Sequence, residues 1–122
     1  MSEMNSEHEE QTAIFEWAKY MQGKYPQLSF MFSTLNGIRL TIGQAKKAKR
    51  AGNKKGISDI CFPWNNGKYA GLWIELKASK GRPTKEQKEF IEFMNQQGHY
   101  AEVVVGSLKS IELIKKYLNN QL

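Results

Sequence analysis

The stretch "LWIELKASKGRPTKEQKEFIEFMNQQGHYAEVVV" (residues 72–105) determines the predicted fold because it combines two apolar strands with an amphipathic helix. Thr84 and Gln87 have capping-box spacing, which predicts that a helix begins there and runs to Gly98. A strand followed by a helix and a second strand normally forms a parallel crossover. These residues therefore predict a parallel pair of strands covered by a helix.

Within the first of these strands, "WIELK" (residues 73–77) places two charged residues where a core is expected. Alternation in a strand puts Trp73, Glu75 and Lys77 on one face and Ile74 and Leu76 on the other. A carboxylate and an ammonium group in a core need compensating partners. Glu75 and Lys77 are therefore expected to have partners that compensate their charges.

The rest of the chain supplies further helices and strands. Helices are expected at residues 7–22 and 41–52, and a last helix is expected to be capped by Ser107. Strands are expected at residues 28–35, 59–64, 70–79 and 100–106, with a turn at the Asn66-Gly67 pair. The order is helix, strand, helix, strand, strand, helix, strand, helix. It predicts an α/β fold with a mixed sheet of about four strands flanked by helices.

Several aromatic residues fall at core spacings, and we expect them to pack in the interior rather than to stack on bases. They are Phe15, Trp17, Phe30, Phe32 and Phe90.

Length and composition predict a single intracellular domain spanning residues 1–122. The apolar runs are too short to cross a membrane, and the acidic beginning of the chain does not resemble a signal peptide. Cys61, the single cysteine, excludes an internal disulfide and is expected to be a small buried apolar residue. Residues 36–44 contain no phosphate-binding glycine pattern, so no nucleotide cofactor is expected.

Positive charge is concentrated in one part of the chain. Residues 17–58 contain no Asp or Glu and carry half of the 18 basic residues. This segregation is typical of a protein that binds a polyphosphate, although a solvated basic helix would give the same pattern. The densest part comprises Lys46, Lys47, Lys49, Arg50, Lys54 and Lys55.

A second carboxylate, Asp59, is expected close to Glu75. It begins the strand that precedes residues 70–79, and the two strands are expected to pair antiparallel. Two carboxylates and Lys77 at strand ends suit a hard divalent cation such as Mg²⁺, which activates water for phosphodiester hydrolysis. A structural salt bridge is the alternative reading of Glu75 and Lys77.

Four motifs in order resemble the VRR-NUC family, a branch of the PD-(D/E)XK nuclease superfamily. They are G-x-x-D at residues 56–59, I-E-x-K at 74–77, G-R-x-T-x-x-Q at 81–87 and G-x-Y-A-x-V-V at 98–104. The resemblance covers roughly residues 7–105. Ser58 departs from it, because proline is usual before the aspartate.

The resemblance implies a restriction-endonuclease-like core and roles for individual residues. Asp59 and Glu75 would be metal ligands, joined by the backbone carbonyl of Leu76, and Lys77 would be the catalytic lysine. Gln87 matches a glutamine that supports the site. The family also uses a glutamate on the first helix, for which Glu7 and Glu10 compete. Glu7 fits the family's spacing better, whereas Glu10 lies on the apolar stripe.

The resemblance also implies DNA as the partner. Asn36 and Arg39 would lie in a polar loop near the active cleft and contact DNA, with an ordinary turn as the alternative reading. The six basic residues from Lys46 to Lys55 would hold the DNA backbone.

The expected activity is that of a Mg²⁺- or Mn²⁺-dependent DNA endonuclease. Similar stand-alone proteins come from phages and bacteria and act as homodimers, which implies a bacterial or phage-infected cytoplasm and favours four-way (Holliday) junctions or other branched DNA. The alternative is a nucleic-acid-binding protein that keeps the fold without the chemistry. An RNA-cutting nuclease is less well supported, because no histidine lies near the acidic residues.

Overall fold

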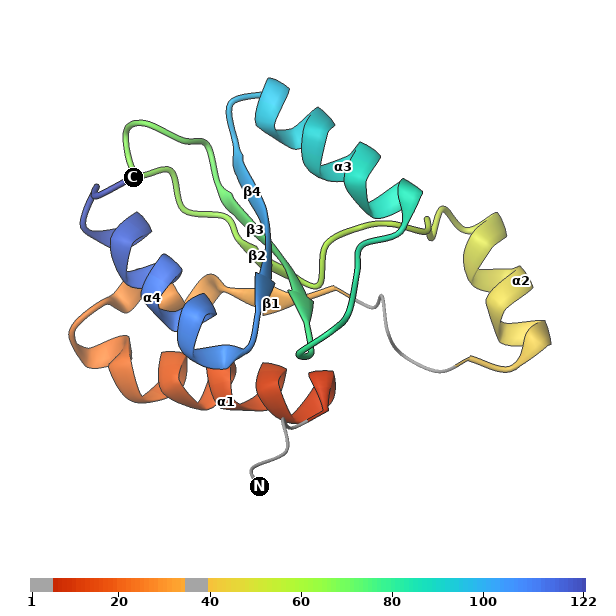
Figure 1. The fold of residues 1–122 in the computed structure, drawn as a ribbon, viewed down its shortest axis with the longest axis horizontal. Helices are drawn as coiled ribbons and strands as arrows, with labels where there is room; N and C mark the ends of the chain where they lie inside the picture. Colours follow the sequence, from red (N-terminus) through yellow and green to blue (C-terminus); the bar gives the residue numbers. More distant parts are fainter. Residues whose placement is uncertain (1–5, 35–39) are drawn as a thin grey trace.

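A mixed four-stranded sheet forms the centre of the structure, a computed structural model that describes residues 6–34 and 40–122. Its strands are β1 (Phe32–Ser33), β2 (Ile60–Phe62), β3 (Leu72–Lys77) and β4 (Tyr100–Val105), and they lie side by side in that order (Figure 1). β1 and β2 pair antiparallel, as do β2 and β3, whereas β3 and β4 are parallel. The predicted mixed sheet and its parallel pair are confirmed.

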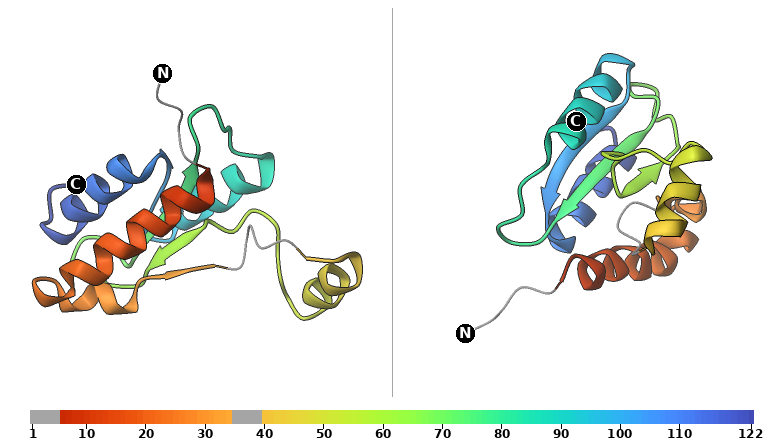
Figure 2. Two further views of the ribbon diagram at one scale, coloured as in Figure 1. Left: turned by 90° about the horizontal axis from the view of Figure 1, so that it is seen from below. Right: turned by 90° about the vertical axis from the view of Figure 1, so that its right-hand side faces the viewer.

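Four α-helices accompany this sheet in the described part of the chain. They are α1 (Glu7–Tyr20), α2 (Ile42–Arg50), α3 (Lys85–Gln96) and α4 (Ser107–Leu118). α1 and α4 cover one face of the sheet, α3 covers the other, and α2 projects from the end of the molecule (Figures 1 and 2). All nine residues of α2 are described, and none of them is buried.

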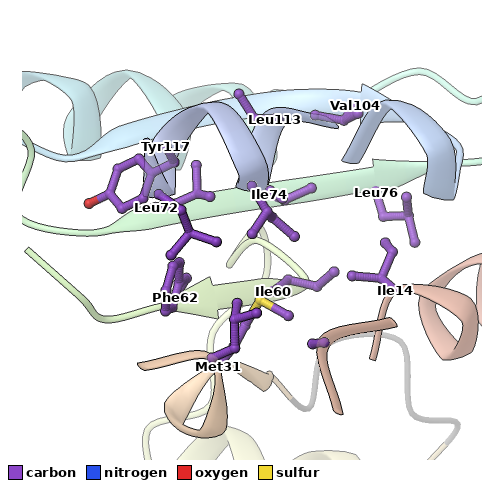
Figure 3. Close-up of a cluster of buried hydrophobic side chains, with 14 residues drawn as sticks. Ile14, Met31, Ile60, Phe62, Leu72, Ile74, Leu76, Val104, Leu113 and Tyr117 are labelled. Atoms are coloured by element: carbon purple, nitrogen blue, oxygen red, sulfur yellow. The ribbon is translucent and has the colours of Figure 1, made fainter. Parts of the chain in front are cut away.

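The main core lies between the sheet and the helices α1 and α4 (Figure 3). Leu72, Ile74 and Leu76 of β3 point into it and are at most 1% exposed. On the opposite face of β3, Trp73 packs edge-on against Phe90 of α3, with 5.3 Å between the ring centres. β3 is therefore covered on both faces, so its charged residues are also enclosed.

The helix starts follow local sequence signals, with one exception. Capping boxes begin α1 at Ser6, α2 at Thr41 and α3 at Thr84. The prediction that Ser107 caps the last helix is wrong: the N-cap of α4 is Gly106, which has no side chain to offer. The carboxylate of Glu10 takes that role by accepting a hydrogen bond from the Ser107 amide at 3.0 Å.

The strand predicted at residues 28–35 is mostly wrong. Residues Pro26–Phe30 form a short 3₁₀ helix, and only Phe32–Ser33 pair with β2. Proline at the beginning of this turn pre-sets the helical backbone angle, which the apolar run that follows does not reveal.

The packing predicted for the aromatic residues holds for three of the five. Phe15 and Trp17 pack against the main core, and Phe90 packs on Trp73. Phe30 and Phe32 are 74% and 47% exposed, so the prediction is wrong for these two. They leave the interior because the strand expected to carry them is short and lies at the sheet edge.

The connection between β2 and β3 is longer than a tight hairpin. Asn66 is buried, and its side-chain oxygen accepts hydrogen bonds from the amides of Lys68 and Tyr69, while its Nδ2 donates to the Tyr117 carbonyl. The Tyr117 hydroxyl donates to the Trp64 carbonyl at 2.8 Å. The Asn-Gly pair thus anchors a loop to the end of α4, and the predicted antiparallel pairing of β2 with β3 is retained.

Candidate active site

A cleft of about 360 Å³ collects residues from four elements at one end of the sheet. Asp59 comes from the chain just before β2, Glu75 and Lys77 from β3, Gln87 from α3, and Glu7 from α1. These side chains are up to 80 residues apart in sequence, from Glu7 to Gln87. All five residues expected to be catalytic therefore line one surface.

The position of Asp59 follows from the register of the sheet. Its Oδ2 accepts a hydrogen bond from the Leu76 amide at 2.8 Å. On its other side, its carbonyl accepts from the Thr34 amide, also at 2.8 Å. The carboxylate is thus held beside the end of β3, where Glu75 and Lys77 emerge.

Glu75 is an almost completely enclosed carboxyl group, with 1% of the residue exposed. Its Oε2 lies 3.4 Å from the Nζ of Lys77. Its Oε1 is buried and makes no hydrogen bond with any residue that the structure describes. Leaving such an oxygen unsatisfied is costly, so the site as built calls for a proton or a cation at this point.

The electrostatics of the site point the same way. The pKa of Glu75 is raised to about 8, mainly by burial and also by the neighbouring Asp59 carboxyl group, while Lys77 opposes the shift. Two carboxyl groups placed this close disfavour a second negative charge. A strongly raised carboxyl pKa in a cleft is typical of a functional site.

The loop between β3 and α3 confines Lys77. A Cβ atom placed on Gly81 would lie 3.1 Å from the Cδ of Lys77 and 3.3 Å from its Cβ. Only 8% of Lys77 is exposed. The backbone at Gly81 therefore covers the lysine stem and leaves its ammonium beside Glu75.

The donor atoms fit a magnesium ion rather than a closed metal cage. Among residues 6–34 and 40–122, no group of three His, Cys, Asp or Glu side chains could hold a metal. Magnesium is commonly bound through one or two carboxylates and keeps water and substrate phosphate as its other ligands. Asp59 and Glu75 match that arrangement.

The backbone carbonyl of Leu76 points toward the β2 side of β3, where Asp59 lies. The Lys77 carbonyl accepts from the Gly106 amide, just beyond the end of β4. Adjacent residues of a strand turn to opposite neighbours, so the Leu76 carbonyl faces the β2 side, as its amide does toward Asp59. The Leu76 carbonyl therefore lies on the side of β3 that Asp59 also occupies.

The two candidate acids of the first helix have different surroundings. Glu7 is exposed and lines the cleft. Glu10 is 8% exposed, and its Oε1 accepts from the amide and hydroxyl of Ser107, at 3.0 and 3.5 Å. Glu10 is thus committed to the start of α4, and Glu7 is the acid that faces the cleft.

Gln87 lies in the cleft wall as part of the capping box of α3. Its side-chain oxygen accepts from the Thr84 amide at 2.8 Å, and its own amide donates to the Thr84 hydroxyl. Its side-chain oxygen is therefore already used in starting the helix. Thr84 and Glu86 also line the cleft, although the sequence analysis did not predict either as a site residue. The sequence indicated Thr84 only as a helix cap, and Glu86 has no distinguishing local pattern.

The predicted DNA-binding residues lie on a protruding segment. Lys46, Lys47, Lys49 and Arg50 belong to α2, and Lys54 and Lys55 follow it; all are exposed. Of these, Lys55 also lines the cleft. Asn36 and Arg39 lie outside the described residues.

Burial accounts for the single cysteine. Cys61 is 4% exposed, and burial raises the pKa of its thiol to about 11. The thiol is therefore neutral at physiological pH, as predicted for a small buried apolar residue.

Comparison with known proteins identifies the fold and the family. The family model for the VRR-NUC domain matches residues 4–108. The chain belongs to the VRR-NUC family. A solved structure described as a VRR_NUC domain protein is 31% identical, with a TM-score of 0.80, covering 94% of this chain and 89% of that one. The restriction-endonuclease-like α/β fold expected from the motifs is confirmed.

Membership of the VRR-NUC family makes this a nuclease-type domain, for which the family implies DNA as substrate. No curated protein matches the chain. Within the described ranges, no helix is both long and apolar enough to cross a membrane.

Proposed function

We propose that this VRR-NUC domain is a Mg²⁺-dependent DNA endonuclease whose reaction takes place in the cleft at Asp59, Glu75 and Lys77. The observation that carries the proposal is the buried Oε1 of Glu75, which lacks a hydrogen-bond partner among the described residues. It lies in a cleft with a second carboxylate and a lysine. A purely structural salt bridge would not require the second carboxylate or the opening to solvent.

Asp59 and Glu75 would hold the metal together with the Leu76 carbonyl. When bound, Mg²⁺ would neutralise phosphate charge and lower the pKa of a water molecule. Mn²⁺ has similar ligand preferences and is expected to substitute for it.

Lys77 would stabilise the negative charge that develops on the phosphate. Its ammonium lies 3.4 Å from Glu75 and its stem is enclosed, so little reorganisation is needed during the reaction. Glu7, on the exposed start of α1, would accept a hydrogen bond from water in the cleft. Gln87 would act mainly by fixing the first turn of α3 against the cleft.

The basic segment would attract and hold the DNA backbone, since phosphate contacts supply affinity without reading sequence. We further propose branched DNA, with the four-way junction as first choice, cleaved by a homodimer that brings one cleft to each of two strands. These two points rest on the likeness of this chain to stand-alone members of its family.

A metal titration followed by thermal unfolding tests the metal site without relying on cleavage. Mg²⁺ and Mn²⁺ should raise the Tm of the wild-type protein because they bind the folded state only. The increase should disappear in Asp59→Asn and Glu75→Gln.

Glu102→Gln is the matched control, because Glu102 is an exposed carboxylate on β4 that lies outside the cleft. It should retain the full increase. An equal increase in Glu75→Gln and the wild type would place the metal elsewhere.

A further inference from the structure

We infer that the basic segment contains a second phosphate-binding site, a hollow next to the cleft. The hollow has a volume of about 570 Å³ and is lined by Ala45, Lys49, Asn53, Lys54 and Lys55. Its ligand would be a backbone phosphate of the same DNA whose scissile phosphate occupies the cleft. The inference rests on the proposed function. It distinguishes the lysines that line the hollow from the other basic residues of the segment.

The three lysines of the hollow form no ion pair with a carboxylate of the described residues. The ion pairs found between described residues use Lys77, Lys85 and Lys116. No Asp or Glu occurs between residues 17 and 58. Three ammonium groups and one side-chain amide around a concave surface offer only hydrogen-bond donors and one carbonyl oxygen, which suits a phosphate anion.

Three backbone carbonyl groups at the helix end beside the hollow are already hydrogen-bonded. The carbonyls of Lys47, Ala48 and Lys49 accept hydrogen bonds from the amides of Ala51, Asn53 and Gly52, respectively. The negative end of the helix is thereby partly satisfied, and the lysine charges dominate the hollow.

Lys55 joins the hollow to the cleft, because it lines both. The next residue, Gly56, has a φ of +88° and lies against the first turn of α3. A Cβ atom there would lie 2.6 Å from the backbone carbonyl carbon and oxygen of Glu86. Only glycine permits both this backbone angle and this approach, so Gly56 sets the position of the hollow relative to the cleft.

Lys46 and Lys47 provide an internal comparison, because they lie on the same helix but do not line the hollow. A diffuse basic surface would use all lysines about equally. A defined phosphate site would depend more strongly on Lys49 and Lys54.

The test compares two double variants that remove the same charge, Lys49→Gln with Lys54→Gln and Lys46→Gln with Lys47→Gln. Binding of a fluorescently labelled four-way junction is measured by anisotropy at several salt concentrations, in chelator. The hollow variant should lose about tenfold or more in affinity, and its log–log salt slope should become shallower by about 0.9, because the contact with one phosphate is lost. The comparison variant should lose less than about threefold.

Equal losses in the two double variants would overturn the second site while leaving the proposed function intact. If the wild-type protein neither binds DNA in a salt-dependent manner nor cleaves it, the proposed function fails and the second site fails with it.

A glycine pair tests whether Gly56 positions the hollow. Gly56→Ala and Gly67→Ala introduce the same side chain at positive φ, but no atom lies within 4 Å of the added Cβ at Gly67. Gly56→Ala should raise KM several-fold more than Gly67→Ala and should increase tryptic cleavage between residues 46 and 55, with an unchanged circular dichroism spectrum. An unchanged KM together with an unchanged tryptic pattern would show that Gly56 does not position the hollow.

Discussion

Glu75 combines burial, a neighbouring carboxylate and an unsatisfied oxygen, and its titration should affect the stability of the metal-free protein. Its pKa is raised to about 8 in the folded state, from 4.5 for an exposed glutamate. The folded state therefore binds the proton more tightly, and this stabilising contribution is complete below about pH 4.5 and is lost as the pH rises toward 8.

Glu75→Gln should remove this pH dependence and stabilise the metal-free protein at pH 8 by about 1 to 3 kcal/mol. Thermal unfolding in chelator between pH 5 and 8 measures the effect. Parallel Tm profiles for the wild type and the variant would show that the proton on Glu75 does not contribute.

Ser58 is a second buried residue with an unsatisfied polar atom. It is fully buried, and its hydroxyl makes no hydrogen bond with the described residues. Ser58→Ala should therefore raise the free energy of unfolding by about 1 kcal/mol, because the desolvated hydroxyl is removed with little change in volume. Urea unfolding measures this; a loss of stability would mean that the hydroxyl has a partner, such as a buried water.

At the residue scale, the sequence predicted which side chains would meet but not all of their roles. Alternation in β3 and its antiparallel pairing with β2 were sufficient to bring Asp59 next to Glu75 and Lys77. The unsatisfied Oε1 of Glu75 was not predictable, because it depends on how β3 is covered from both faces.

At the scale of helices, Glu10 links the first turn of α1 to the first turn of α4 across 97 residues of sequence. It supplies a negative charge where α4 lacks a capping side chain. Glu10→Ala should destabilise the fold by about 1 to 2 kcal/mol, because a buried helix start loses its acceptor.

Glu7→Ala is the matched variant, three residues away on the same helix. It should leave the free energy of unfolding within about 0.5 kcal/mol of the wild type, because Glu7 is exposed, while lowering nuclease activity. Urea unfolding and cleavage rates measured for both variants separate the roles. Loss of stability in Glu7→Ala with no loss in Glu10→Ala would reverse the assignment.

Helices with local signals were predicted well, whereas elements set by tertiary contacts were not. The capping box at Thr84 indicated where α3 begins. The exposed aromatic residues Phe30 and Phe32 have the composition of a strand, but an edge strand of two residues cannot bury them. The anchoring of Asn66 to Tyr117 spans 51 residues and has no local signature.

At the scale of the whole molecule, the candidate catalytic residues and the cluster of basic residues lie in two different regions. The cleft lies at the end of the sheet. The basic residues lie on α2 and the chain that follows it, and α2 projects from the end of the molecule (Figures 1 and 2). Lys55 and Gly56 connect the two regions. In the proposed function, this segment would hold DNA along its backbone while one phosphate enters the cleft.

The most direct test of the account is cleavage of labelled four-way junction, flap and duplex DNA, with Mg²⁺, Mn²⁺ or chelator. Wild-type protein should cleave only with metal and should prefer the branched substrates. Lys77→Ala should reduce the rate by about 10² to 10⁴-fold, because the positioned ammonium is lost, while its circular dichroism spectrum stays unchanged. Salt-dependent binding without metal-dependent cleavage of any of these DNAs would contradict the account and make the domain a nucleic-acid-binding protein.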